Sequence, residues 1–340
     1  MRMLLVKLSS LGDVVHALPA VTDAARAHRG LEVHWVVEEA YQAIPALHPA
    51  VTRVIPVAIR RWRRSVRGAG AEIRACVQAL RATEYELVLD AQGLIKSALV
   101  ASVCRGPRAG FDRASAREPL ASLGHRRGIA VPQRQHAIDR QRALFAGALC
   151  YPLPPAAVDY GIARGRDGAS GLLFAHGTTW HNKRWPEPFW AELARCALRV
   201  GQRVTLPWAD AQEHSRAQRI AALAPGARVA DRTDLRGIIE LLASSAAVVS
   251  VDSGIGHLAA ALGVPTIALY GPTDAALTGC RGTAVHNVAS DFECAPCVER
   301  RCGYRGDPVL IDATRVEPAC FSRVTPERVW QQLRAAALPT

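Results

Sequence analysis

The chain has 340 residues, of which 49% are apolar, and its formal net charge at neutral pH is +12. This length exceeds that of most single domains, so we expect two domains, each with its own hydrophobic core. No apolar run reaches the roughly 18–20 residues that a membrane-spanning helix requires, which argues against an integral helical membrane protein.

Strand-like and helix-like runs alternate along the first half of the chain. The apolar run in Met1–Leu8 is too short for a signal peptide, so we expect the first strand of a cytoplasmic protein there. The expected strands are 3–8, 33–37 and 87–89, and the expected helices are 14–27, with a kink near Pro19, and 73–83. Proline, glycine and charged residues then gather at 156–170, which we interpret as a linker after a first domain of residues 1–155.

The same alternation resumes after the linker and indicates a second domain at 171–325. The expected strands are 171–175, 203–207 and 248–252, and the expected helices are 189–200, 217–222 and 238–243. The closing stretch 326–340 contains one more helix, which could pack back on the first domain. We therefore predict an α/β protein with two Rossmann-like, doubly wound parallel sheets facing across a cleft, where ligands bind beyond the carboxyl ends of the strands.

The most informative motif is the turn Asp252-Ser-Gly-Ile-Gly-His257, which follows a β-branched apolar run. Its glycines, Gly254 and Gly256, let the backbone approach a ligand closely. The turn also opens a helix, so amide N–H groups and the positive end of the helix dipole face the ligand. We expect Ser253, His257 and the rest of this turn to hold a phosphate or diphosphate, with Asp252 orienting a hydroxyl or a cation.

A second loop, His176–Pro186, presents the hydroxyls of Thr178 and Thr179 and the ammonium of Lys183. An ordinary polar loop would have a similar composition, but one compact cation beside two hydroxyls suits a diphosphate. Glu213 follows the next strand and could bind a ribose, although an isolated glutamate is more often only a surface residue.

Asp13 follows the first strand in the segment Ser9-Ser-Leu-Gly-Asp13 and lies in the first turn of a helix. The helix dipole favours a carboxylate there, so a capping role is the simpler interpretation. The functional interpretation makes Asp13 a general base.

The positive charge is concentrated in the first half of the chain. Residues 1–150 contain 22 Lys and Arg against 12 Asp and Glu, a net charge of +10. The segment Ile59–Arg67 alone holds five arginines around one tryptophan. We expect an anionic partner, since guanidinium groups bind carboxylates and phosphates bidentately. Nucleic acid is a weaker hypothesis, because no series of aromatic residues accompanies the arginines.

The chain contains nine cysteines, most of them scattered as is typical of reduced core thiols. Four of them form a C-x2-C-x4-C-x17-C series: Cys294, Cys297, Cys302 and Cys320. A structural zinc site, a redox or disulfide pair, and free thiols all remain open for this series. No catalytic metal triad, Walker loop or G-x-S-x-G elbow is present.

Taken in order, these motifs resemble the bacterial lipopolysaccharide heptosyltransferases of glycosyltransferase family 9, and most closely those that add the first heptose. The similarity runs through nearly the whole chain. The segments that carry it are Lys7–His16, Asp90-Ala-Gln-Gly-Leu-Ile-Lys-Ser97, Ser115-Ala-Arg-Glu-Pro119, the loop of Thr178 and Lys183, Leu206-Pro-Trp208, Asp252–His257 and Tyr270-Gly-Pro-Thr-Asp274.

The resemblance implies a GT-B fold and an inverting transfer of L-glycero-D-manno-heptose from ADP-heptose to a Kdo hydroxyl of Kdo2-lipid A. It implies no cofactor and no metal ion, a monomer, and a location on the cytoplasmic face of the inner membrane of a Gram-negative bacterium. The anionic acceptor and the anionic membrane surface would both explain the basic first domain.

The resemblance also assigns roles to residues. Asp13 corresponds to the catalytic base, and Lys183 assists the departure of ADP. The donor residues are Thr178, Thr179, Lys183, Glu213, Asp252, Ser253, Gly254, Gly256 and His257. The expected acceptor residues are Ser10, Arg60, Arg61, Arg63, Arg64, Gln92, Lys96 and Arg117. The alternatives are another sugar-nucleotide enzyme of similar architecture, such as an epimerase, a hydrolase or a different heptosyltransferase, and a basic nucleic-acid-binding protein.

Overall fold

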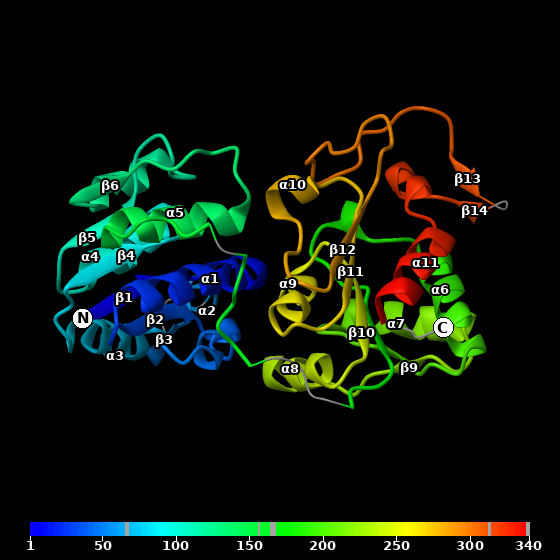
Figure 1. Ribbon diagram of the computed structural model, residues 1–340, viewed down its shortest axis with the longest axis horizontal. Helices are drawn as coiled ribbons and strands as arrows, with labels where there is room; N and C mark the ends of the chain where they lie inside the picture. The colour runs from blue at the N-terminus through cyan, green and yellow to red at the C-terminus, as the bar shows by residue number, and fades with distance from the viewer. Residues whose placement is uncertain (65–67, 156, 164–167, 312–313, 338–340) are drawn as a thin grey trace. The chain divides into compact units, whose positions relative to one another are not determined.

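The computed structural model describes residues 1–64, 68–155, 157–163, 168–311 and 314–337. The chain folds into two compact units, Met1–Ile162 and Ala163–Thr340. Each unit is built on one six-stranded parallel sheet with helices on both faces (Figure 1). This arrangement confirms the predicted α/β class with two doubly wound parallel sheets.

The sheet of the first unit has the strand order β3-β2-β1-β4-β5-β6. Its strands are β1 (Arg2–Val6), β2 (Glu32–Glu38), β3 (Val51–Val57), β4 (Leu87–Asp90), β5 (Arg108–Phe111) and β6 (Arg127–Ile129). The central strand β1 is fully buried from Met3 to Val6, as expected for a continuous apolar run in a parallel sheet. Its carboxyl end and that of β4 lie side by side, because Val6 is in register with Asp90.

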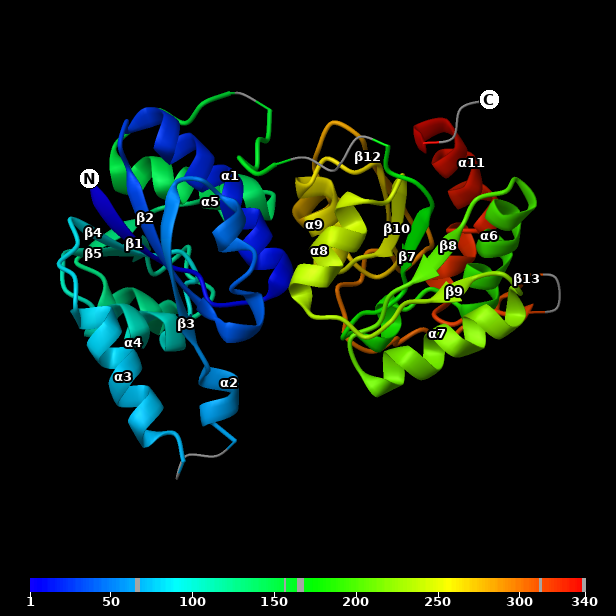
Figure 2. The same ribbon diagram turned by 90° about the horizontal axis from the view of Figure 1, so that it is seen from below.

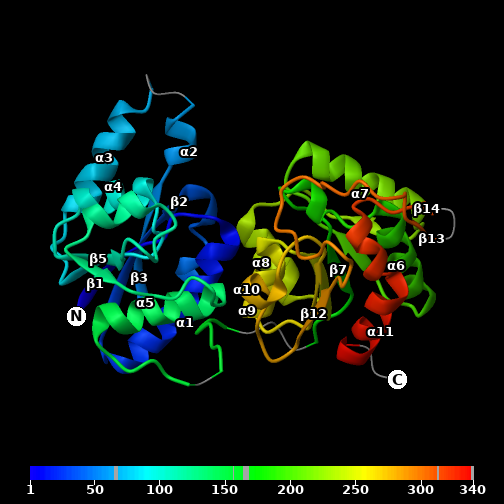
Figure 3. The ribbon, with the colours of Figure 1, turned by 90° about the horizontal axis from the view of Figure 1, so that it is seen from above.

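The helices of the first unit form two layers. Helices α1 (Leu11–Ala27) and α5 (Ala137–Leu149) pack against each other on one face of the sheet. The other face is covered by α2 (Ile59–Trp62), α3 (Gly70–Arg81) and α4 (Ile95–Val103), whose apolar side chains share one core with β1 and β4 (Figures 2 and 3). Short 3-10 turns lie at Glu39–Tyr41, Pro45–Leu47 and Pro119–Gly124, the last of which (η3) packs beside α4.

The sheet of the second unit has the order β12-β11-β10-β7-β8-β9, which repeats the topology of the first. Its strands are β7 (Leu172–Ala175), β8 (Val204–Leu206), β9 (Arg228–Val229), β10 (Ala247–Val251), β11 (Thr266–Tyr270) and β12 (Val285–Ala289). A small antiparallel pair, β13 (Leu310–Ile311) and β14 (Thr314–Arg315), lies outside this sheet.

Helices α6 (Glu187–Arg199), α7 (Ala211–Leu223) and α11 (Pro326–Ala337) cover one face of the second sheet, with Trp185 and Trp190 fully buried in the core beneath them. Helices α8 (Leu235–Ala243) and α9 (Gly254–Ala261) lie on the other face, and α10 (Ala275–Thr278) follows β11 (Figure 1). The sequence pattern left the packing of the last helix open. Its Val329 and Leu333 lie in the core of the second unit.

None of the helices within the described ranges is long and apolar enough to cross a bilayer.

Candidate functional site

The predicted donor residues lie at the carboxyl ends of neighbouring strands in the second unit. Strand β10 pairs with β7 on one side and with β11 on the other. The loops that follow these three strands therefore meet at one edge of the sheet. They carry Thr178 and Lys183 after β7, Asp252 after β10 and Thr273 after β11.

Asp252 is the centre of this edge. Its side chain is only 7% exposed, and Lys183 Nζ lies 2.7 Å from its Oδ2 atom. The Thr273 hydroxyl donates a hydrogen bond of 2.6 Å to the same oxygen. A buried carboxylate needs a cation and hydrogen-bond donors, and these two residues provide both. Asp252 therefore holds the Lys183 ammonium at a defined position.

Two further contacts fix the loop that carries Lys183. The Lys183 ammonium lies 4.3 Å from the centre of the Trp180 ring, within the range of a cation–π interaction. The Thr178 hydroxyl lies 3.5 Å from the Asp252 carbonyl oxygen, and Thr179 is exposed. The motifs that contain Trp180 and Thr273 do not by themselves indicate a role for either residue.

The glycine-rich turn after β10 opens helix α9 at Ser253. The Ser253 hydroxyl lies 3.0 Å from that of Ser250, which ties the turn to the end of β10. Gly256 packs so closely on this strand that a Cβ atom would lie 3.0 Å from Ser250 Oγ. The first turn of α9 leaves its amide N–H groups without carbonyl partners in the helix, so Gly254 and its neighbours offer donors to an anion.

His257 is buried rather than turned to solvent. Its Nδ1 atom lies 3.3 Å from Cys280 Sγ, and its Nε2 atom lies 3.9 Å from Asp252 Oδ1. The imidazole thus lies behind the turn, next to the carboxylate that pairs with Lys183.

Glu213 lies in the first turn of α7 and is half-buried. It accepts a hydrogen bond of 2.9 Å from the Ala209 amide. Burial raises the pKa of the Glu213 carboxyl, and Asp210 adds to the increase. A Cβ atom on Gly177 would come within 2.3 Å of Glu213 Oε1, so a larger residue at that position would displace the Glu213 carboxylate.

Glu213 also borders a cavity of about 160 Å³ between the loop after β7 and helix α7. Ion pairs between Glu187 and the guanidinium groups of Arg216 and Arg219 form another part of its wall. The cavity thus combines hydrogen-bond donors and acceptors, as a polar ligand group requires.

In the first unit, the loops after β1 and β4 are held together by Lys7 and Gln92. Gln92 Oε1 accepts hydrogen bonds from the amides of Leu8 and Ser9, at 3.1 and 3.2 Å. The buried Lys7 ammonium donates to the Ala91 carbonyl at 2.9 Å. Burial lowers the pKa of Lys7, and the nearby carboxylates of Asp13 and Asp90 oppose that shift.

Asp13 lies at the start of α1, as the sequence predicts. Its Oδ2 atom accepts hydrogen bonds from the Ser10 amide at 2.7 Å and from the Ser10 hydroxyl at 2.9 Å. Asp13 thus caps the helix and remains partly exposed. Lys96 Nζ lies 3.3 Å from Ser9 Oγ, which places a second cation beside this turn.

The other predicted acceptor residues divide into two groups. The backbone of Arg117 lies beside Gly93, so this exposed residue belongs to the same edge of the sheet as Gln92. The arginines around α2 lie farther along, after the edge strand β3.

These α2 arginines differ in their partners. Arg60 donates to the Tyr41 hydroxyl at 2.9 Å, and Arg61 forms ion pairs with Glu39 and Glu72. Arg63 and Arg64 are exposed, and Arg67 lies outside the described residues.

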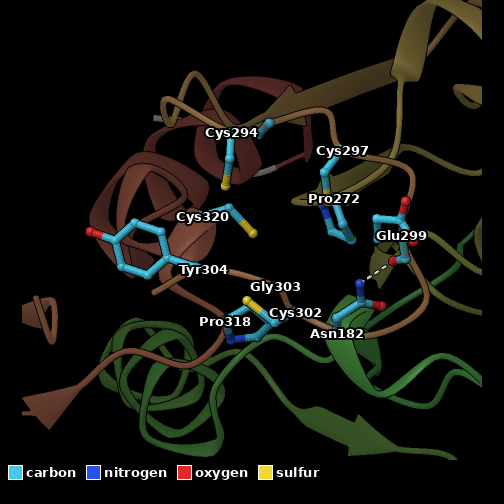
Figure 4. A pocket seen from close by; sticks show the side chains of 11 residues that line it. Asn182, Pro272, Cys294, Cys297, Glu299, Cys302, Gly303, Tyr304, Pro318 and Cys320 are labelled. Carbon is cyan, nitrogen blue, oxygen red and sulfur yellow. Dashed lines mark hydrogen bonds between the residues drawn. The ribbon is translucent and has the colours of Figure 1, made fainter. Parts of the chain in front are cut away.

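The four cysteines of the predicted series line a single cavity of about 150 Å³ in the second unit (Figure 4). Within the described part of the chain, no group of three or more His, Cys, Asp or Glu side chains is already arranged to hold a metal ion.

Comparison with known proteins identifies the family of this chain. The family model for glycosyltransferase family 9 (heptosyltransferase) matches residues 73–306. The chain is 51% identical to the lipopolysaccharide heptosyltransferase 1 of Pseudomonas aeruginosa PAO1, over 99% of this chain and 98% of that protein.

Two solved structures of an Escherichia coli protein are also similar. The heptosyltransferase WaaC with ADP superposes with a TM-score of 0.86 and 39% identity, covering 99% of this chain and 100% of that one. WaaC with ADP-2-deoxy-2-fluoro heptose gives a TM-score of 0.77 and 44% identity, covering 84% and 92%.

Proposed function

The chain belongs to glycosyltransferase family 9, the heptosyltransferases, and we propose that it transfers L-glycero-D-manno-heptose from ADP-heptose to a Kdo hydroxyl of Kdo2-lipid A, in lipopolysaccharide inner-core biosynthesis. One observation supports the proposed binding of the ADP-heptose donor: Lys183, Asp252 and the α9 turn lie together at one edge of the second sheet. The two Rossmann-like sheets belong to the GT-B fold, which is shared with the solved relatives.

The second unit supplies what a nucleotide-diphosphate sugar needs. The Lys183 ammonium, the Thr178 and Thr179 hydroxyls and the amides at the start of α9 would bind the diphosphate oxygens. Glu213 would accept hydrogen bonds from the ribose hydroxyls. Bound ADP and a fluorinated ADP-heptose in the similar E. coli structures support this class of donor.

The proposed reaction is a single inverting displacement. The acceptor hydroxyl attacks the anomeric carbon of heptose while the bond from that carbon to the diphosphate oxygen breaks on the opposite face. Asp13 takes the hydroxyl proton, and ADP leaves with the bonding electron pair. Lys183 and the helix amides stabilise the negative charge that develops on the leaving diphosphate. Because these groups supply positive charge at the diphosphate, we propose that transfer requires no metal ion there.

The first unit would hold the acceptor. The carboxylates of Kdo and the phosphates of lipid A require cations, and Lys96 and Arg117 lie at the same sheet edge as Asp13. Arg63 and Arg64 are exposed and free to approach an anion, whereas Arg61 already has two carboxylate partners. We therefore expect Arg63 and Arg64 to contribute more to acceptor binding than Arg61.

The helical layer of the first unit that contains α2, α3 and α4 exposes apolar side chains. Leu99 on α4 is 64% exposed, and Leu120 and Leu123 on η3 are 64% and 79% exposed. The arginine-rich helix α2 lies on this layer too (Figure 2). Exposed leucines beside cations are typical of surfaces that bind anionic bilayers. We propose that this layer docks a monomer on the cytoplasmic face of the inner membrane, where the lipid acceptor resides.

An assay with purified protein, ADP-heptose and Kdo2-lipid A tests the proposed reaction. We expect ADP release and a mass increase of one heptose on the acceptor, and only slow donor consumption when the acceptor is left out. Rapid consumption of ADP-heptose without acceptor would instead indicate a hydrolase or an epimerase.

A further inference from the structure

A buried histidine–aspartate pair lies at the carboxyl end of β4 in the first unit, and the proposed mechanism does not use it. His125 Nε2 lies 3.2 Å from Asp90 Oδ2, and neither side chain is accessible to solvent. The other ring nitrogen, Nδ1, lies 3.3 Å from the Phe111 carbonyl oxygen. A carboxylate only accepts hydrogen bonds, so His125 donates to Asp90 from Nε2. Burying a carboxylate costs free energy unless donors surround it, and His125 is one of these donors.

The fold leaves room for the imidazole ring of His125. Asp90 ends β4 and is in register with Gly110 of the neighbouring strand β5. A Cβ atom on Gly110 would lie 2.3 Å from His125 Cε1, so a larger residue there would displace the ring. His125 comes directly after η3, 35 positions beyond Asp90 in the sequence. The ring therefore occupies the space beside the glycine and reaches the buried carboxylate.

The Asp90 carboxylate fixes the loop that follows β4. Its Oδ1 atom accepts hydrogen bonds from the amides of Gln92 at 2.9 Å and of Gly93 at 3.3 Å. Its Oδ2 atom, which faces His125, also lies 3.0 Å from the hydroxyl of Ser97 in the first turn of α4. One carboxylate thus holds both the backbone of this loop and the start of the helix.

The loop after β4 and the start of α4 hold, in turn, the loop that carries the proposed base. Gln92 Oε1 accepts a hydrogen bond of 3.2 Å from the Ser9 amide, and Lys96 Nζ lies 3.3 Å from the Ser9 hydroxyl. The next residue, Ser10, donates from its amide and its hydroxyl to Asp13 Oδ2. Consecutive short contacts within the first unit therefore connect the buried pair with the base.

We propose that His125 and Asp90 are positioning residues for Asp13, an inference that rests on the proposed function. A general base must lie within hydrogen-bond distance of the hydroxyl whose proton it takes, and a displacement of about 1 Å can lower the rate about 10²-fold. His125 supplies a donor that keeps the Asp90 carboxylate directed at the loop after β4. Without that donor, the two loops would sample other positions, and Asp13 would lie less often within reach of the acceptor hydroxyl.

Two variants of His125 differ in whether a donor to Asp90 remains. His125→Gln retains an N–H group that can donate to the carboxylate, whereas His125→Met has a similar length and no donor. In His125→Met, we expect kcat of heptose transfer to fall about 10- to 100-fold, with unchanged affinity for ADP, which binds to the second unit. His125→Gln should recover most of the rate.

His34→Met is the matched control for a purely structural effect. His34 is also buried in the first unit, where its Nδ1 atom lies 2.9 Å from Tyr85 Oη. Tyr85 precedes β4 and so lies toward the amino ends of the strands, opposite the edge that carries Asp13. His34→Met should lower the Tm but transfer heptose with the kcat of the wild type at temperatures where both proteins are folded.

Amide hydrogen exchange tests the positioning without any activity. The amides of Leu8 and Ser9 donate to Gln92, so their exchange reports whether the loop stays in place. Mass spectrometry of peptides from this loop should show faster exchange in His125→Met, and exchange at the wild-type rate in His125→Gln and His34→Met. If His125→Met does not fold, His125→Asn takes its place, because this side chain keeps a donor toward Phe111 but is too short to reach Asp90.

A wild-type kcat in the variant that lacks the donor would overturn the proposal, and so would unchanged exchange of the Ser9 amide. An equal loss of kcat in His34→Met would also overturn it, because the effect would then be one of stability. Heptose transfer by the wild type is measured separately. Its absence would remove the proposed function, while the exchange experiment would still decide whether the buried pair fixes the loop.

Discussion

Lys183 and Asp252 lie 69 residues apart in the sequence, and their side chains meet with Nζ 2.7 Å from Oδ2. The lysine comes from the loop after β7 and the aspartate from the turn after β10, and these strands are neighbours in the sheet. Because only 7% of the Asp252 side chain is exposed, the carboxylate has little water to solvate it and depends on this partner. The pair therefore places one compact positive charge beside the amides of α9, where a diphosphate would bind.

The first prediction concerns the charge of Lys183. In Lys183→Ala, kcat should fall about 10²- to 10³-fold, because one preorganised positive group no longer stabilises the leaving ADP. Lys183→Arg should recover part of the rate, since it keeps the charge. The exposed Arg203, which donates to Ser170 Oγ at 2.7 Å, provides the control, and Arg203→Ala should transfer heptose normally. An unchanged kcat in Lys183→Ala would remove this residue from the mechanism.

The second prediction concerns Thr273, which donates a 2.6 Å hydrogen bond to Asp252 Oδ2. Thr273→Val keeps the shape of the side chain but removes that donor. We expect the free energy of unfolding to fall by about 1.5–3 kcal/mol, the usual contribution of a hydrogen bond to a charged group. ADP binding should weaken as well, because Asp252 no longer has a fixed orientation.

Thr266→Val is the matched control for Thr273→Val. Thr266 is also buried, and its hydroxyl donates to the Val264 carbonyl at 2.7 Å, away from the donor edge. Thr266→Val should lower the free energy of unfolding. Its affinity for ADP, measured by calorimetric titration, should equal that of the wild type. Equal ADP affinity in the two variants would show that Thr273 has only a structural role.

The third prediction concerns pH and Glu213, whose carboxyl pKa is raised by burial above its ordinary value of 4.5. A raised pKa means that the fold favours the protonated form, so the wild type loses stability as the pH rises through the pKa of Glu213 in the folded protein. Glu213→Gln avoids this loss. Its Tm should exceed that of the wild type at neutral pH, and the difference should vanish below the ordinary pKa.

The same substitution should weaken ADP binding roughly tenfold, because the ribose loses a charged acceptor. Glu240→Gln, at an exposed position on α8, should change neither Tm nor ADP affinity. A Tm of Glu213→Gln below that of the wild type at neutral pH would contradict the assigned direction of the pKa shift.

The fourth prediction concerns the exposed leucines of the first unit. Replacing both Leu120 and Leu123 by serine should weaken binding to vesicles containing phosphatidylglycerol by roughly tenfold or more, since each buried leucine contributes about 1.5–3 kcal/mol. Sedimentation with the vesicles measures the change. Replacing both Leu223 and Leu310, which are 48% and 61% exposed in the second unit, should leave vesicle binding unchanged.

Transfer to a Kdo disaccharide without acyl chains should be equally fast in the Leu120 and Leu123 variant and in the wild type. Unaltered vesicle binding in this variant would exclude the leucines from the docking surface, without bearing on the chemistry of transfer.

Much of the fold could be predicted from the sequence because buried parallel strands are continuous apolar runs, as in β1, β7 and β10. Elements without that pattern were missed. Strand β3 carries Arg53 and Pro56 at the edge of its sheet, and α5 mixes polar and apolar residues, with Arg142 buried against Asp23. Neither segment shows a clear period of two or 3.6 residues, since long-range pairing rather than local pattern stabilises it.

The residues of the candidate site could be predicted where a motif lies in the loop that follows a strand, as at Asp13, Lys183 and Asp252. Its partners were not, because they come from distant parts of the chain. Glu39 and Glu72 neutralise Arg61, and Cys320 joins three cysteines from which 17 or more residues separate it. Spacing along the chain carries no information about such contacts.

The most direct test of the proposed mechanism is the rate of heptose transfer by Asp13→Asn, measured together with its affinity for ADP. Asparagine can still accept the hydrogen bonds from Ser10, so the helix cap is retained and only the base is lost. Asp234→Asn is the control, because Asp234 also caps a helix, as the N-cap residue of α8 that accepts from the Gly237 amide at 3.0 Å.

We predict that Asp13→Asn transfers heptose about 10²- to 10⁴-fold more slowly than the wild type and binds ADP with unchanged affinity, while Asp234→Asn remains fully active. Transfer by Asp13→Asn at the wild-type rate would contradict the assignment of Asp13 as the base and, with it, the proposed mechanism.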